Sequence, residues 1–194
     1  MITRIEIDGY KSFERFELDL FPFTVIAGSN AVGKSNLFDV FRHISKLVTK
    51  TLREAFETER GSLLDLFTIY PDGSHKPTIR YAIEMLLPAS VQDEFSVEAT
   101  LKYLRLRYEL AVTYNEDGHL TLLHESLKPI KRENDNFLKI YPNVKKLYPK
   151  SQVDANLSLT HRMMNKVLLF LKMAMLVINV KAIFQVRNAR YSRA

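Results

Sequence analysis

The chain has no cysteine among its 194 residues. This absence excludes disulfide bonds, thiolate metal sites and a cysteine nucleophile, and it is compatible with a cytoplasmic protein. No signal peptide is expected at the start, because Glu6 arrives before any long apolar region. The composition, 46% hydrophobic and 26% charged residues, is that of a globular domain. We therefore expect a cytoplasmic protein without a membrane partner.

Over most of the chain neither sign of charge is in excess. Of the 28 basic and 22 acidic residues, seven basic residues and one acidic residue lie in 151–194, which leaves 21 of each sign in 1–150. A neutral body argues against a broad nucleic-acid-binding surface, although the net charge is +6. We therefore divide the chain into an N-terminal lobe, 1–150, and a basic tail, 151–194.

The basic tail has three open interpretations. Val167–Val180 is a mostly apolar run of 14 residues, interrupted by Lys172 and Asn179, and is too short and broken for a transmembrane helix. It could form a core or partner-binding helix, or a helix lying on a membrane surface. Alternatively, the tail is truncated or translated out of frame from about Arg162. Reading the coding sequence of this region one nucleotide earlier can give a polar amino-acid sequence. The nucleotide sequence would decide.

Residues 28–36 read Gly-Ser-Asn-Ala-Val-Gly-Lys-Ser-Asn, the Gly-x-x-x-x-Gly-Lys-Ser pattern of a phosphate-binding P-loop. The two glycines allow backbone turns that aim N–H groups inward, the lysine adds a charge for the outer phosphates, and the serine hydroxyl can ligate Mg²⁺. The pattern predicts binding of ATP and Mg²⁺, with Ser35 as the metal ligand. The predicted site comprises Gly28, Ser29, Asn30, Ala31, Val32, Gly33, Lys34, Ser35 and Asn36.

The surrounding sequence supplies the strand and the helix that such a loop requires. Residues 23–27 are apolar and β-favouring, so they predict a buried strand leading into the loop. Helical periodicity runs from about Lys34 to about Phe56, with a break near Thr49 or Thr51. Further strands are expected at 5–7, 16–20, 78–87, 104–114 and 120–123, with a turn at 115–119 and a loop or short helix over 131–150. The expected fold is α/β: a mixed sheet around the P-loop, with an antiparallel insertion over about 76–130.

The run 104–114 is the strongest strand signal, because large apolar residues alternate with polar ones along it. Arg105, Arg107 and Glu109 fall on the polar face. We interpret this face as solvated, and a nucleic-acid contact is the alternative.

The sequence also resembles a known family. The opening Ile-Thr-Arg-Ile-Glu-Ile-Asp-Gly-Tyr-Lys-Ser-Phe, residues 2–13, looks like the first strand and turn of ABC-type ATPases of the SMC, RecF and RecN kind, and 16–20 looks like their second strand. The P-loop is similar to theirs, with Ala31 where many relatives have glycine. Within this group, the sequence most resembles the OLD-like bacterial "AAA family ATPases" that are associated with phage defence. The resemblance covers 1 to about 56 well and 76–130 loosely.

The resemblance implies an ATPase head that pairs with a second head as a homodimer, with the nucleotide held between them. It implies a task in DNA repair or phage defence, with DNA and a nuclease or toxin as possible partners. It also places Lys11 beside the nucleotide, as a phosphate or ribose contact; the alternative is a solvated turn lysine.

Two catalytic parts are missing from the sequence. No apolar run ends in Asp-Glu, the pair that holds Mg²⁺ and polarises water, and no Ser-Gly-Gly-like signature is present. The five histidines show no metal-ligand spacing. We expect the first lobe of an ATPase that hydrolyses ATP slowly or not at all by itself; the alternative is an inactive fragment serving as a nucleotide-binding or interaction module. A P-loop kinase is disfavoured by the strands that precede the loop.

Overall fold

The computed structural model describes residues 1–30, 32–56, 62–88, 90–92, 98–100, 103–115 and 118–143. Ala31 and the tail 151–194 lie outside the described residues, so the expectations for them are not tested. The elements are β1 Ile2–Asp8, β2 Phe16–Asp19, α1 Lys34–Thr49, α2 Leu52–Phe56, the 3-10 helix η1 Leu63–Leu66, β3 Thr78–Leu86, β4 Ser90–Gln92, β5 Glu98–Thr100, β6 Arg105–Tyr114, β7 Leu120–Pro129, the 3-10 helix η2 Arg132–Asn134 and α3 Asn136–Ile140.

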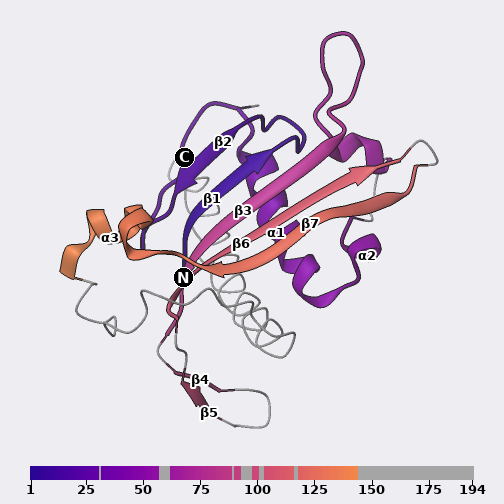
Figure 1. Cartoon of the computed structure of the whole chain (residues 1–194). Coiled ribbons are helices and arrows are strands. Elements are labelled where there is room, and N and C mark those ends of the chain that lie inside the picture. Colours follow the sequence, from indigo (N-terminus) through magenta and orange to yellow (C-terminus); the bar gives the residue numbers. More distant parts are fainter. Residues whose placement is uncertain are drawn as a thin grey trace, which may run out of the picture.

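A five-stranded sheet in the order β2-β1-β3-β6-β7 forms the centre of the described structure (Figure 1). All its pairings are antiparallel, so the described sheet is antiparallel where a mixed sheet was expected. The expected α/β class is confirmed. The antiparallel strands expected within 76–130 are present as β3, β6 and β7, and they continue the sheet of β1 and β2. The short strands β4 and β5 pair with each other beyond one end of β3 and β6.

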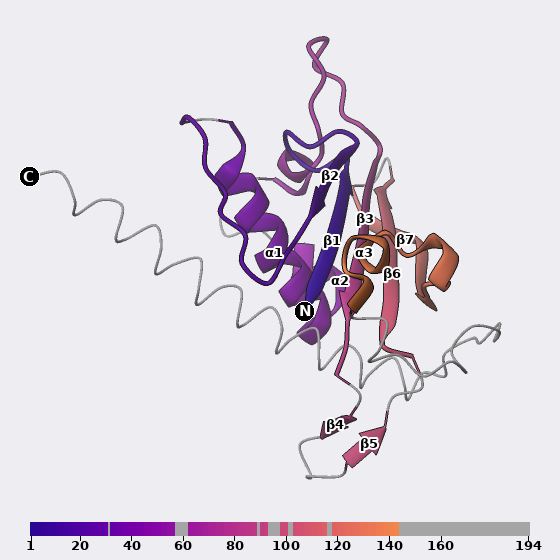
Figure 2. The ribbon, with the colours of Figure 1, turned by 90° about the vertical axis from the view of Figure 1, so that its left-hand side faces the viewer.

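One face of the sheet is apolar and is covered by α1 and α2 (Figure 2). The registers Ile7↔Tyr81 and Tyr81↔Leu110 place these side chains on the same face. α1 contributes apolar residues at helical spacing to the same core, so the sequence pattern could predict this helix. The α1 core residues are Leu37, Val40, Phe41 and Ile44.

The helix break predicted near Thr49 or Thr51 is confirmed, and its cause is local. The Thr51 N–H donates to Glu54 Oε2 at 2.8 Å, and the Glu54 N–H donates to Thr51 Oγ1 at 3.3 Å. This reciprocal pair is a capping box, which starts a new helix, α2, three residues after α1 ends.

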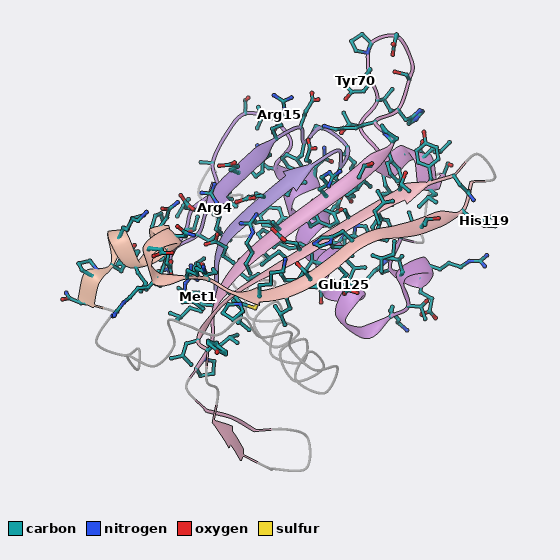
Figure 3. All side chains as sticks on the ribbon, viewed as in Figure 1. Met1, Arg4, Arg15, Tyr70, His119 and Glu125 are labelled. Atoms are coloured by element: carbon teal, nitrogen blue, oxygen red, sulfur yellow. The ribbon has the colours of Figure 1, made fainter. Side chains whose placement is uncertain are left out.

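The opposite, outer face of the sheet carries ion pairs. Arg4, labelled in Figure 3, contacts three carboxylates on β1 and β2. Arg107 Nη2 lies 2.6 Å from Glu6 Oε2, and its Nε lies 2.8 Å from Glu109 Oε1. The arginines of β6 are therefore matched by carboxylates within the fold rather than left available for phosphates.

Arg105 corrects the expectation of a wholly solvated face, because its exposed fraction is only 3%. Its guanidinium makes two bonds to the Asp135 carboxylate, Nε–Oδ2 at 2.7 Å and Nη2–Oδ1 at 2.9 Å. Asp135 is fully buried and also accepts from the Leu138 N–H at the start of α3. The strand pattern could not reveal this burial, because the helix that covers Arg105 comes 30 residues later in the chain.

The buried strand predicted at 23–27 is wrong. No strand forms there, and Phe23 and Val25 are 70% and 61% exposed. The physical reason is twofold: no described strand lies alongside to accept its backbone hydrogen bonds, and a local turn competes. In that turn the Phe21 N–H donates to Thr24 Oγ1 at 2.9 Å, and the Thr24 hydroxyl donates back to the Phe21 carbonyl at 3.2 Å.

Two further expectations are confirmed. The expected hairpin between β6 and β7 is present, with the Gly118 N–H donating to the Asn115 carbonyl at 2.9 Å, and β7 runs on to Pro129, past the expected end at Leu123. Within the described part of 131–150, loop and short helix alternate as expected. Among the described residues, no helix combines the length and apolar character that crossing a membrane requires.

Candidate phosphate-binding site

α1 begins within the predicted P-loop, directly after Gly33. Gly33 occupies the N-cap position with φ 89°, in the left-handed region, and no side chain caps the helix. A Cβ at this position would approach Ser12 Oγ to 3.2 Å, in a backbone conformation that L side chains rarely adopt. The first turn of α1 contains no acidic residue. The N–H groups and the positive end of the helix are therefore not neutralised by its own first turn.

Two P-loop side chains belong to this first turn. The Lys34 ammonium donates to the carbonyl of Gly28 at 2.7 Å and to that of Ser29, so its charge lies over the loop. Ser35 is exposed at the second position of the helix. A lysine charge, a free hydroxyl and an uncapped helix start form a donor set that fits a phosphate chain with Mg²⁺. Ala31 lies outside the described residues, between Asn30 and Val32.

A second segment, the turn over 10–13, lies against the start of α1. Asn36 Nδ2 donates to Ser12 Oγ at 2.8 Å. Lys11 Nζ lies 2.7 Å from Asp39 Oδ2, on the second turn of the helix. The structure thus brings Lys11 to the P-loop helix but pairs it there with a carboxylate. The sequence did not point to Ser12 or Asp39, although a signal existed: Asp39 follows Ser35 by four residues, so both share a helix face.

α1 itself carries a buried histidine on the turn after Asp39. His43 is 6% exposed, its Nδ1 lies 3.1 Å from the Tyr81 hydroxyl, and its ring packs edge-on against Phe56. Burial, aided by the positive charges of Lys46 and Lys11, lowers the pKa of His43 to about 4. His43 therefore belongs to the core rather than to a metal or phosphate site.

Two described acidic residues outside α1, Asp65 and Glu109, are engaged in contacts away from the P-loop. Asp65 accepts from the Ser62 N–H at 2.6 Å in the capping box of η1. Glu109 pairs with Arg107 on the outer face of the sheet. The adjacent acids Asp93 and Glu94 lie outside the described residues. Within the described part of the chain, no group of three or more potential ligands could hold a metal ion by itself.

The glycine-started helix, with lysine and serine in its first turn on an α/β scaffold, defines a P-loop nucleoside triphosphate-binding protein. The chain belongs to the AAA ATPase domain family, whose profile matches residues 1–173. This membership confirms the predicted resemblance to a P-loop ATPase.

Solved structures of SMC proteins are similar to the chain. One comes from work on ATP-driven dimerization and DNA-stimulated activation of SMC ATPases: it is 18% identical with a TM-score of 0.40, over 81% of this chain and 86% of that one. Another is an Smc head bound to the C-terminal winged-helix domain of ScpA, 19% identical with a TM-score of 0.36. That match covers 68% of this chain and 37% of the Smc head chain. No curated protein matches the chain.

Proposed function

We propose that the chain is the N-terminal lobe of an ATPase head that binds ATP and Mg²⁺ through Gly28–Asn36, with Lys11 as an additional phosphate or ribose contact. The observation that carries the proposal is the start of α1. Gly33 opens the helix without a side-chain cap or a first-turn acid, and Lys34 and Ser35 follow at once. Membership of the AAA ATPase domain family supports the choice of ATP.

Calorimetric titration of the purified chain with Mg-ATP tests this proposal. Lys34→Ala removes the charge on the outer phosphates but leaves the backbone loop intact. A charge-assisted hydrogen bond is worth about 1.5–3 kcal/mol, so we expect a roughly tenfold or greater loss of affinity. Lys50→Ala is the matched control, because it removes the same charge at the other end of α1. Equal affinities for the wild type and Lys34→Ala would refute the P-loop assignment.

The metal has its own test at Ser35. Ser35→Ala should leave ATP binding in chelator nearly unchanged and should reduce the gain in affinity that Mg²⁺ gives, because the hydroxyl is the metal ligand that the motif supplies. If the substitution changes affinity equally with and without Mg²⁺, Ser35 does not ligate the metal.

Catalysis is a separate question from binding. Asp65 and Glu109 are engaged in local contacts, and no apolar run in the sequence ends in Asp-Glu. A P-loop positions phosphates but not the attacking water. We therefore expect near-background phosphate release from the isolated chain. Turnover near 1 s⁻¹ or above, lost in Lys34→Ala, would show that a catalytic acid lies among residues 57–194.

The finer part of the proposal is a head-to-head homodimer, active in the cytoplasm in DNA repair or phage defence, with DNA and a nuclease or toxin as partners. The resemblance of residues 2–13 and of the P-loop supports it. Light scattering with and without ATP would test the dimer, and an unchanged monomer mass would contradict it for this chain. In the alternative, an inactive nucleotide-binding or interaction module, ATP binds without turnover and without dimer formation.

A further inference from the structure

The turn that carries Lys11 is fixed at its backbone. Lys11 has φ 48°, in the left-handed region, and its N–H donates to the Leu66 carbonyl at 2.8 Å. The turn closes on both sides of it, with the Gly9 N–H bonded to the Phe13 carbonyl at 2.9 Å. The long side chain is therefore the part of Lys11 that can move, and it starts from a fixed point beside α1.

The Lys11 ammonium contacts the first acidic residue of α1. It lies 2.7 Å from Asp39 Oδ2, and the two side chains are 28% and 33% exposed. The other carboxylate oxygen of Asp39 accepts from Arg42 Nη1 at 3.2 Å. Asp39 thus has two cationic partners, and the loss of Lys11 would leave its charge compensated by Arg42.

The uncapped start of α1 is about one helical turn away from this ion pair. Asp39 follows Ser35 by four residues, which corresponds to about 6 Å along the axis. Ser12, next to Lys11 in the chain, accepts a bond from Asn36 in the first turn of α1. A lysine fixed at this point can reach either the Asp39 carboxylate or an anion held at the helix start by changing side-chain rotamers alone.

We infer that Asp39 is a positioning residue that competes with bound nucleotide for Lys11. The ammonium leaves Asp39 for the phosphates of ATP, which carry more charge than one carboxylate, and Arg42 remains on Asp39. ATP affinity is thereby set lower than the P-loop alone would give. The inference rests on the proposed ATP-binding function.

The test is a double-mutant cycle on the full chain, read as Mg-ATP affinity by calorimetry. Asp39→Asn keeps the shape of the side chain and releases Lys11, so it should tighten binding by about twofold to fivefold, the range expected for a partly exposed ion pair. In a Lys11→Ala background the same substitution should have no effect. Arg42→Gln should weaken binding, because the carboxylate then holds Lys11 more strongly. Glu133→Gln, on η2, removes one negative charge elsewhere and serves as the control.

Three results would overturn the inference while leaving the proposed function standing. The first is an unchanged or weaker ATP affinity in Asp39→Asn. The second is an equal gain in affinity from Asp39→Asn with and without Lys11, which would mean that Asp39 repels the nucleotide directly. The third is a tighter ATP affinity in Arg42→Gln. Binding by the wild type that is lost in Lys34→Ala establishes separately that ATP occupies the P-loop. A wild type that does not bind ATP overturns both proposals.

Discussion

The buried histidine of α1 should make the protein sensitive to mild acid. His43 has a pKa of about 4 in the fold, against 6.5 for an unperturbed histidine, chiefly because burial disfavours its charged form. Between these two values the unfolded chain binds a proton that the folded chain does not. The free energy of unfolding therefore falls as the pH drops from about 6.5 to about 4, and His43 has no such effect above that range.

The size of the effect follows from the shift in pKa. One unit corresponds to about 1.4 kcal/mol, so the full shift costs about 3 kcal/mol of stability at the acid end. The cleanest window is pH 6 to 5, where about 1 kcal/mol should be lost. It lies below the pKa of the Met1 amine, which burial lowers to about 6. It also lies above the range of Glu6, whose pKa the Arg107 guanidinium lowers to about 2 from the model-peptide value of 4.5.

Urea unfolding at pH 7.5, 6 and 5, followed by circular dichroism, measures this loss. His43→Phe is the informative variant, because phenylalanine fills a similar volume and does not titrate. Its stability at neutral pH will be lower, since Tyr81 loses its partner at 3.1 Å, so the comparison is the change between pH 6 and 5. We expect the wild type to lose about 1 kcal/mol more than the variant. Equal losses would refute the conclusion that the fold keeps His43 neutral.

Two further predictions concern stability at neutral pH, read as urea midpoints. Gly9→Ala should prevent folding or lower the free energy of unfolding by several kcal/mol, because a Cβ there would lie 2.1 Å from the backbone oxygen of Thr78. Gly73 has a similar φ of 82° but no atom nearby, so Gly73→Ala should cost only about 1 kcal/mol of stability. Similar costs for both would contradict the predicted clash. Asp135→Asn should cost roughly 3 kcal/mol, because it leaves the buried Arg105 charge poorly matched, and a cost below about 1 kcal/mol would show that water reaches the pair.

The P-loop could largely be predicted from the sequence, because its chemistry depends on residues that are neighbours in the chain. Gly33, Lys34 and Ser35 are adjacent, and the helix that follows reveals itself through its own apolar spacing. The strand β6 and its hairpin turn were predictable for the same reason, since alternation and turn residues are local signals. The break between α1 and α2 rests on a capping box only four residues long.

Only the tertiary structure decided how distant segments meet. The burial of Arg105 depends on Asp135, and the pairing of Lys11 with Asp39 depends on a turn that precedes α1 by more than twenty residues. Residues 23–27 show the converse: their β propensity is strong, yet a strand exists only where a neighbour accepts its hydrogen bonds, and no described segment does so. The sequence by itself determined which residues can bind phosphate. The fold decided which charges surround them, because charge pairing depends on distance in space rather than along the chain.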